Sequence, residues 1–128
     1  MRTALFQSKM IMRIGLWLAF AGGLLAADSA DAGTLDRVRE TGVFRIGYRT
    51  DAAPFSYKNA IDEPAGYVVD LCREVAAATK DELALSDLKL EYVTVTAENR
   101  FDAVKSGKID ILCEATTATL ARRKLVDF

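Results

Sequence analysis

The chain has 128 residues, enough for one small domain, and carries 17 Lys and Arg residues against 18 Asp and Glu residues. A net charge of −1 argues against nucleic acid as a partner, and a hydrophobic content of 51% argues against a disordered tail. The absence of histidine excludes Ser-His-Asp and Cys-His catalysis and histidine-containing metal sites, and two cysteines cannot form a four-thiolate zinc site. We therefore expect neither a metal nor a cofactor.

The N-terminal segment has the layout of a secretory signal peptide. Basic residues and no acidic ones stand among residues 1–13, a mostly apolar run follows over residues 14–27, and residues 30–32 read Ala-Asp-Ala. The apolar run is shorter than the about 20 residues that a helix needs to span a bilayer. We predict that residues 1–32 are a signal peptide cleaved after Ala32, the alternative being an uncleaved membrane anchor.

The exported part begins with a predicted helix and strand. Thr34 can cap a helix whose apolar positions are Leu35 and Val38, and Gly42 can end it in the left-handed conformation. Residues 43–48 (VFRIGY) are rich in β-branched and aromatic side chains, which predicts a strand.

A hairpin and a longer helix are predicted next. Pro54 disfavours a helix in its neighbourhood, and the turn-forming residues 58–64 predict the tip of a hairpin. Residues 68–79 predict a helix, because apolar residues recur there at helical spacing. The apolar stripe consists of Val68, Leu71, Cys72, Val75 and Ala76.

Two further strand and helix patterns follow. Residues 89–95 alternate polar and apolar side chains, as a half-buried strand does, and residues 97–106 predict a helix with Phe101 and Val104 facing inward. Residues 109–113 form a nearly continuous apolar run of the kind buried in parallel sheets.

The last predicted element is a short helix over residues 117–124. The threonines at positions 116, 117 and 119 stand before or within it, where they can bind an anion or simply cap the helix. The repeated alternation of strands and helices predicts an α/β domain with a mostly parallel sheet. Ligands of such sheets bind at the carboxyl ends of the strands.

Three arginines fall in or beside the turns at that edge: Arg49, Arg100 and Arg122. A guanidinium group binds carboxylates bidentately and keeps its charge. The three side chains would therefore suit an anionic or zwitterionic small ligand, the alternative being that each is a solvated surface residue. Phe55 and Tyr57 follow Arg49 closely and either stack on a ligand or belong to the core.

Several short motifs follow one another along the exported part. They are Arg45-Ile46-Gly47, Pro54-Phe55-Ser56-Tyr57, Gly66-Tyr67-Val68-Val69-Asp70-Leu71, Asn99-Arg100, Gly107-Lys108-Ile109-Asp110, Thr116-Thr117-x-Thr119-x-x-Arg122 and Val126-Asp127-Phe128. In this order and spacing they resemble the N-terminal part of a family 3 extracellular solute-binding protein, the periplasmic amino-acid-binding component of an ABC importer. The resemblance implies a periplasmic-binding-protein-like fold with three α/β/α layers. Residues 33–128 would form its first lobe only, incomplete, and the second lobe would close over the ligand.

The resemblance also implies how the α-carboxylate of an amino acid is held. The family has an arginine at the position of Arg122 that binds this carboxylate, assisted by the residue at Thr117 and the backbone around Ala115. An aromatic residue at the position of Phe55 or Tyr57 packs on the ligand.

Family members selective for glutamate and aspartate carry further arginines at the positions of Arg49 and Arg100, and this chain has both. Because a neutral ligand side chain would leave two buried cations without partners, we expect an acidic ligand. The chain departs from that subgroup at Ala97 and Ala115, where a serine hydroxyl would be expected.

A non-enzymatic, monomeric periplasmic receptor that delivers its amino acid to a membrane permease is thus the leading prediction. Two alternatives on the same fold stay open. One is an enzyme similar to cyclohexadienyl dehydratase, which would need a carboxylate acid or base in the cleft. Glu114 is the candidate, although it could equally be an ordinary strand-end or surface residue. The other is the extracellular sensor lobe of a receptor or channel.

Cys72 and Cys113 are predicted to form a disulfide. Cys72 lies in the first turns of a helix and Cys113 ends a strand, and these positions meet at one edge of a parallel α/β layer. Export places the pair in an oxidising compartment. The alternative is two buried free thiols.

Overall fold

The computed structural model describes residues 33–128, so the predicted signal peptide and its cleavage after Ala32 lie outside the described residues. Along the described chain no helix is both long and apolar enough to cross a membrane. The elements are α1 (Thr34–Thr41), β1 (Val43–Tyr48), β2 (Asp51–Ala52), β3 (Ser56–Lys58), β4 (Pro64–Ala65), α2 (Tyr67–Glu82), β5 (Lys89–Thr94), α3 (Arg100–Lys105), β6 (Ile111–Cys113) and α4 (Leu120–Arg123).

The main sheet has the strand order β5-β1-β6, and both pairings are parallel. Tyr48, the last residue of β1, lies opposite Thr94 on one side and Cys113 on the other. The carboxyl ends of all three strands therefore meet at one edge. The prediction of an α/β domain with a parallel sheet is confirmed, although the domain is partial and open.

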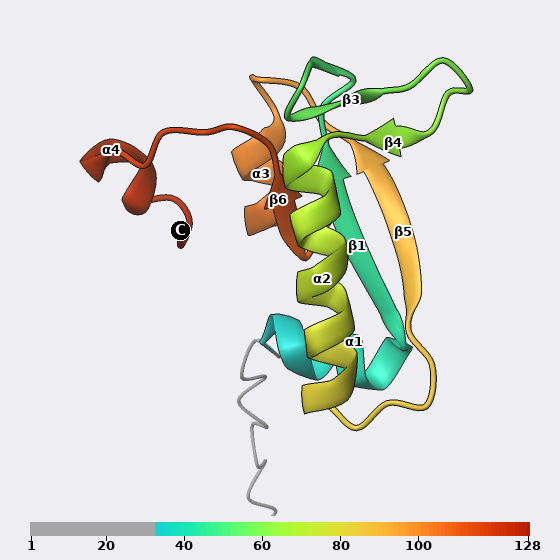
Figure 1. Ribbon diagram of the computed structural model, residues 1–128. Helices are drawn as coiled ribbons and strands as arrows, with labels where there is room; N and C mark the ends of the chain where they lie inside the picture. Colours follow the sequence, from blue (N-terminus) through green and yellow to red (C-terminus); the bar gives the residue numbers. More distant parts are fainter. Residues whose placement is uncertain (1–32) are drawn as a thin grey trace, which may run out of the picture.

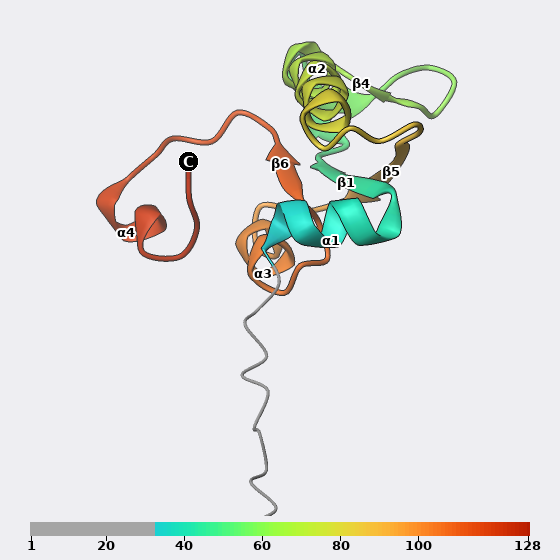
Figure 2. The ribbon, with the colours of Figure 1, turned by 90° about the horizontal axis from the view of Figure 1, so that it is seen from below.

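Helices cover both faces of this sheet, with α2 on one side and α1 and α3 on the other (Figure 2). The larger core cluster lies under α2 and is built around Phe44, Ile46 and Ala76. A smaller cluster joins Ala103 of α3 to Ile109. By contrast, α4 and the C-terminal segment project away from the sheet (Figure 1).

A disulfide joins Cys72 of α2 to Cys113 at the end of β6. The two Cα atoms are 6.3 Å apart, and both residues are buried in the larger core cluster. The predicted pairing is confirmed, because the helix start and the strand end meet at the same edge of the sheet, as the topology requires.

The short strands β2, β3 and β4 form a separate antiparallel sheet beside the carboxyl ends of β1 and β5 (Figure 1). Arg73 of α2 holds this hairpin to the main sheet, because it donates to the carbonyl of Pro64 and to the hydroxyl of Tyr92, each at 2.8 Å. Gly66 allows the hairpin to enter α2: it has a φ of 123°, and a Cβ there would lie 2.3 Å from the carbonyl oxygen of Phe55.

Helix α1 begins at Thr34 itself with Gly33 in the N-cap position, so the prediction that Thr34 caps the helix is wrong. Gly42 ends the helix in the left-handed conformation, as predicted, and donates its N–H to the carbonyl of Val38. Val38 is fully buried, whereas Leu35 is half exposed. One apolar residue thus anchors α1 to the sheet.

The predicted apolar stripe of α2 is partly wrong. Leu71 and Val75 are exposed, whereas Val69, which the stripe omitted, is fully buried together with Cys72 and Ala76. The disulfide and the hairpin set the rotation of α2, and they turn this narrower face toward the sheet.

The last two helices are shorter than predicted. Helix α3 starts at Arg100, and its buried residues are Arg100 and Ala103, while Phe101 and Val104 are half-buried. In α4 the N-cap is Thr119, whose hydroxyl accepts from the backbone N–H of Arg122. Residues 115–119 are therefore non-helical.

Candidate ligand-binding site

The carboxyl edge of the main sheet gathers charged side chains from three separate segments. Arg49 directly follows β1, Arg100 opens α3 beyond β5, and Glu114 directly follows β6. The parallel register brings these positions together although they are far apart in sequence. The expected meeting of Arg49 and Arg100 at this edge is observed.

Glu114 is the centre of the cluster, and its side chain is only 1% exposed. Its Oε1 lies 3.0 Å from Nη1 of Arg100, and its Oε2 lies 3.8 Å from Nε of Arg49. The hydroxyl of Thr116 also donates to this carboxylate. The expectation that Arg49 and Arg100 lack partners inside the protein is therefore wrong, because Glu114 faces both.

From the sequence, Glu114 is a possible catalytic acid or base or an ordinary strand-end or surface residue, and the structure places it directly after β6. Its position in the sequence could have identified its role as the partner of both arginines. Glu114 directly follows β6, Arg49 directly follows β1, and the two strands are neighbours in the sheet. An acid at that position of a parallel sheet faces the turn after the neighbouring strand.

Arg49 has a second carboxylate partner. Its Nε and Nη2 donate to the two oxygens of Asp51 at 2.9 and 2.8 Å. This bidentate hydrogen bonding raises the pKa of Arg49, and it lowers the pKa of Asp51. The buried hydroxyl of Ser56 accepts from the backbone N–H of Arg49 at 2.9 Å and so fixes the turn.

Arg100 is almost fully buried, and its Nε has no hydrogen-bond partner within the described part of the chain. Its guanidinium carbon lies 4.9 Å from the ring centroid of Phe101, and the guanidinium carbon of Arg122 lies 5.7 Å from the same centroid. Cation–π attraction thus connects Arg122 to the Arg100 side of the cluster.

The chain around Arg122 is more open. Nη1 of Arg122 donates to the carbonyl of Thr117 at 2.8 Å, across the turn that leads into α4. Ala115 and Thr117 are exposed. The backbone of this turn is therefore accessible beside a guanidinium group, which is an arrangement able to bind a carboxylate.

Phe55 and Tyr57 lie in the hairpin next to Arg49. Phe55 is 43% exposed and Tyr57 is half-buried, and neither belongs to a core cluster. Tyr57 stands opposite Asp51 in the β2–β3 pairing, which places it beside the partner of Arg49. Of the two earlier alternatives, membership of the core is therefore wrong for both side chains.

Glu98 adds a further charge beside the cluster. Its pKa is lowered first by hydrogen bonding to Thr96 and to its own backbone, and then by the charges of Arg49 and Arg100. Glu98 is exposed to solvent, so it carries its negative charge at the rim of the site.

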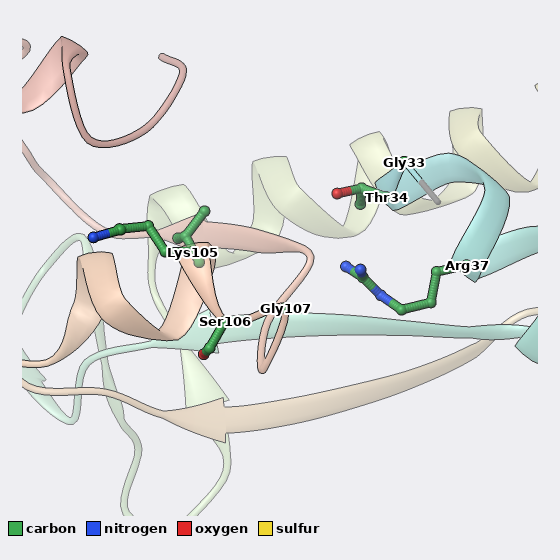
Figure 3. Close-up of a pocket in the computed structure, with 7 residues that line it drawn as sticks. Gly33, Thr34, Arg37, Lys105, Ser106 and Gly107 are labelled. Carbon is green, nitrogen blue, oxygen red and sulfur yellow. The ribbon is translucent and has the colours of Figure 1, made fainter. Parts of the chain in front are cut away.

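Two cavities flank the sheet. One of about 360 Å³ lies between β6, α3 and the C-terminal residues, and Glu114, Phe101 and Phe128 contribute to its lining. Another of about 280 Å³ lies near the start of α1, where Arg37 extends toward the loop at Gly107 (Figure 3). Glu114 and Thr116 connect the first cavity to the charged cluster, whereas Arg49, Arg100 and Arg122 line neither cavity.

The comparisons with known proteins agree with this architecture. Residues 44–128 match the family model for bacterial extracellular solute-binding proteins, family 3. An L-glutamate/L-aspartate-binding protein of Pseudomonas aeruginosa is 42% identical over 75% of this chain and 32% of its own length. A glutamate/aspartate import solute-binding protein of Escherichia coli is 33% identical over 88% of this chain and 38% of its own length.

A solved structure shows the same likeness. The cysteine-binding protein of Campylobacter jejuni is 36% identical, with a TM-score of 0.64 over 75% of this chain and 37% of that one. The chain thus spans between 32% and 38% of the lengths of these proteins.

Proposed function

The chain belongs to the bacterial extracellular solute-binding proteins of family 3, and from this premise we propose that it forms part of the binding site of a periplasmic amino-acid receptor. The observation that carries the proposal is the meeting of Arg49 and Arg100 at the carboxyl edge of the sheet, with Arg122 on the ring of Phe101, which Arg100 also contacts. A cluster of guanidinium groups at that edge suits a ligand that carries a carboxylate.

In this proposal Arg122 binds the α-carboxylate of the ligand. Its side chain is already oriented by the carbonyl of Thr117, and the backbone at Ala115 and Thr117 is accessible. Phe55 and Tyr57 pack against the ligand from the hairpin, since both lie near Arg49 outside the core.

The proposed ligands are glutamate and aspartate. Two relatives are named for these amino acids, and Arg49 and Arg100 are the side chains that would face a second carboxylate. The unpartnered Nε of Arg100 is a buried donor that an acceptor on the ligand could satisfy.

The proposed receptor is not an enzyme. A catalytic acid or base must be free to transfer a proton, whereas the carboxylate of Glu114 is already engaged by Nη1 of Arg100 and by the hydroxyl of Thr116. We propose further that residues 1–32 act as its signal peptide and that residues 33–128 belong to its first lobe. It would act as a monomer in the periplasm and pass its ligand to an ABC permease.

Calorimetry on the full-length protein tests the carboxylate contact. Arg122→Ala should weaken amino-acid binding at least about 30-fold, because the loss of one partner of a desolvated charge pair costs about 2–5 kcal/mol. Arg123→Ala is the matched control, since Arg123 is exposed on the same helix. Near-native affinity in Arg122→Ala would refute the assignment.

A thermal-shift screen of the wild-type protein against the twenty amino acids tests the ligand class. A bound ligand raises the melting temperature, and the rise grows with the logarithm of the ligand concentration divided by its Kd. Glutamate or aspartate should give the largest rise. A larger rise with leucine or arginine would show that the proposed ligand is wrong.

A further inference from the structure

Glu114 places a protein carboxylate at the position where the two arginines would otherwise meet a carboxylate of the ligand. It lies 3.0 Å from Arg100 and 3.8 Å from Arg49, and only 1% of its side chain is exposed. Water therefore does little to screen its charge, and its interaction with both guanidinium groups is strong.

The charge available to a ligand is reduced accordingly. Arg49 and Arg100 carry two positive charges, Glu114 balances one of them, and Asp51 binds Arg49 bidentately from the solvent side. The field that distinguishes a charged ligand side chain from a neutral one is then much weaker than that of two free arginines.

The hydrogen-bonding groups at the site do not favour the acid either. The buried Nε of Arg100 can donate to a carboxylate oxygen or to an amide carbonyl. The carboxylate of Glu114, together with the hydroxyl of Thr116, offers acceptors that an amide NH₂ can use and a second carboxylate cannot.

We propose that Glu114 is a specificity-determining residue that lets the site accept the amides glutamine and asparagine alongside glutamate and aspartate. The inference rests on the proposed function, because it concerns the same site. Specificity is a difference between two affinities, and the buried carboxylate makes that difference small by weakening the preference for the acid.

Calorimetric titration of the full-length protein with glutamate, glutamine, aspartate and asparagine tests the inference. In the wild-type protein each acid and its amide should bind within about tenfold of each other. In Glu114→Gln the preference for the acid should rise at least about tenfold, the change expected when one unit charge is removed near a ligand charge in a partly buried site.

Asp102→Asn is the control, because it removes the same charge from an exposed position on α3 outside the site. Its acid-to-amide ratio should stay close to that of the wild-type protein, since water screens exposed charges. A ratio that rises equally in both variants would overturn the inference.

An unchanged ratio in Glu114→Gln, with tight binding retained, would overturn the role of Glu114 and leave the proposed receptor function intact. A wild-type protein that binds none of the four amino acids would overturn both. Melting temperatures without ligand establish that each variant is folded. Should Glu114→Gln not fold, Glu114→Ala removes the same charge and leaves room for water beside the two arginines, and an unchanged ratio in that variant would equally overturn the inference.

Discussion

Two buried carboxylates stand at opposite ends of β6, and arginines approach both of them. Asp110 precedes the strand and Glu114 follows it, and each side chain is 1% exposed. Asp110 accepts from Nε and Nη2 of Arg37 at 3.2 and 2.6 Å and from the backbone N–H of Arg45 at 2.7 Å. Glu114 lies 3.0 Å from Arg100, within that range, and 3.8 Å from Arg49, which is beyond hydrogen-bonding distance.

Asp110 forms a structural ion pair, whereas the arginines around Glu114 keep donors that a ligand can use. Asp110 joins α1 to β1 and β6 with three directed hydrogen bonds, so its acceptor capacity is well used. At the other end the buried Nε of Arg100 has no partner among residues 33–128, and Arg49 shares its donors with the exposed Asp51. The same residue types thus stabilise one end of the strand and leave the other end able to interact.

The largest expected effect is at Asp110. Asp110→Asn should lower the free energy of unfolding by about 3–5 kcal/mol, because both carboxylate oxygens accept hydrogen bonds and the NH₂ of asparagine would face either Arg37 or the backbone N–H of Arg45, which are donors. Urea unfolding of the full-length protein measures this loss. Asp102→Asn, which changes an exposed acid on α3, is the control. An equal loss in both variants would contradict the structural role of Asp110.

The disulfide should matter next, because Cys113 directly precedes Glu114 and ties that end of β6 to α2. Replacing Cys72 and Cys113 by alanine should cost about 2–4 kcal/mol of unfolding free energy, since the bridge closes a loop with a sequence separation of 41. Denaturant unfolding of the double variant measures the cost. Thiol titration of the unreduced, denatured wild-type protein should find no free thiol, and two free thiols would contradict the bridge.

Glu114→Gln should lower the free energy of unfolding by about 1–3 kcal/mol, which is less than the loss expected for Asp110→Asn. Glutamine keeps an acceptor for Arg100, and Arg49 keeps its contact with Asp51. The two isosteric variants, unfolded in parallel, compare the two ends of β6 directly. A greater loss in Glu114→Gln would reverse the comparison.

The smallest effect concerns Asp51 and pH. Hydrogen bonding by Arg49 lowers the pKa of Asp51 in the folded state, so the contact stabilises the protein above the unfolded pKa of about 3.9 and is lost as the pH falls through the lower folded value. Unfolding free energies of wild type and Asp51→Asn, measured from pH 7 downward, should differ slightly and then converge. A gap that persists at the acid end would contradict this assignment.

Much of the fold follows from local sequence. The run VFRIGY between Gly42 and a polar turn predicted β1 with the bounds observed, because β-branched and aromatic side chains favour extended backbone. The turn-forming residues 58–64 predicted the hairpin tip between β3 and β4. The pairing of Cys72 with Cys113, preferred over two free thiols because of the shared edge of a parallel sheet and the predicted export, is present in the structure.

Other features depend on contacts between distant segments. Periodicity placed apolar residues on one side of α2, but the hairpin and the disulfide decided that Val69 is buried and that Leu71 and Val75 are exposed. Thr119 rather than Thr117 precedes α4, because capping depends on where the chain leaves its extended path after β6.

The cluster of Arg49, Arg100 and Glu114 depends both on the local sequence and on contacts between distant segments. The spacing of the sequence was sufficient to bring Arg49 and Arg100 to the carboxyl edge, because the ends of parallel strands must coincide there. That Glu114 lies buried between them was decided only by the register of β1 against β6 and by the start of α3. Local pattern determines which face or edge a residue occupies, whereas the pairing of charges from separate segments requires their distances in three dimensions.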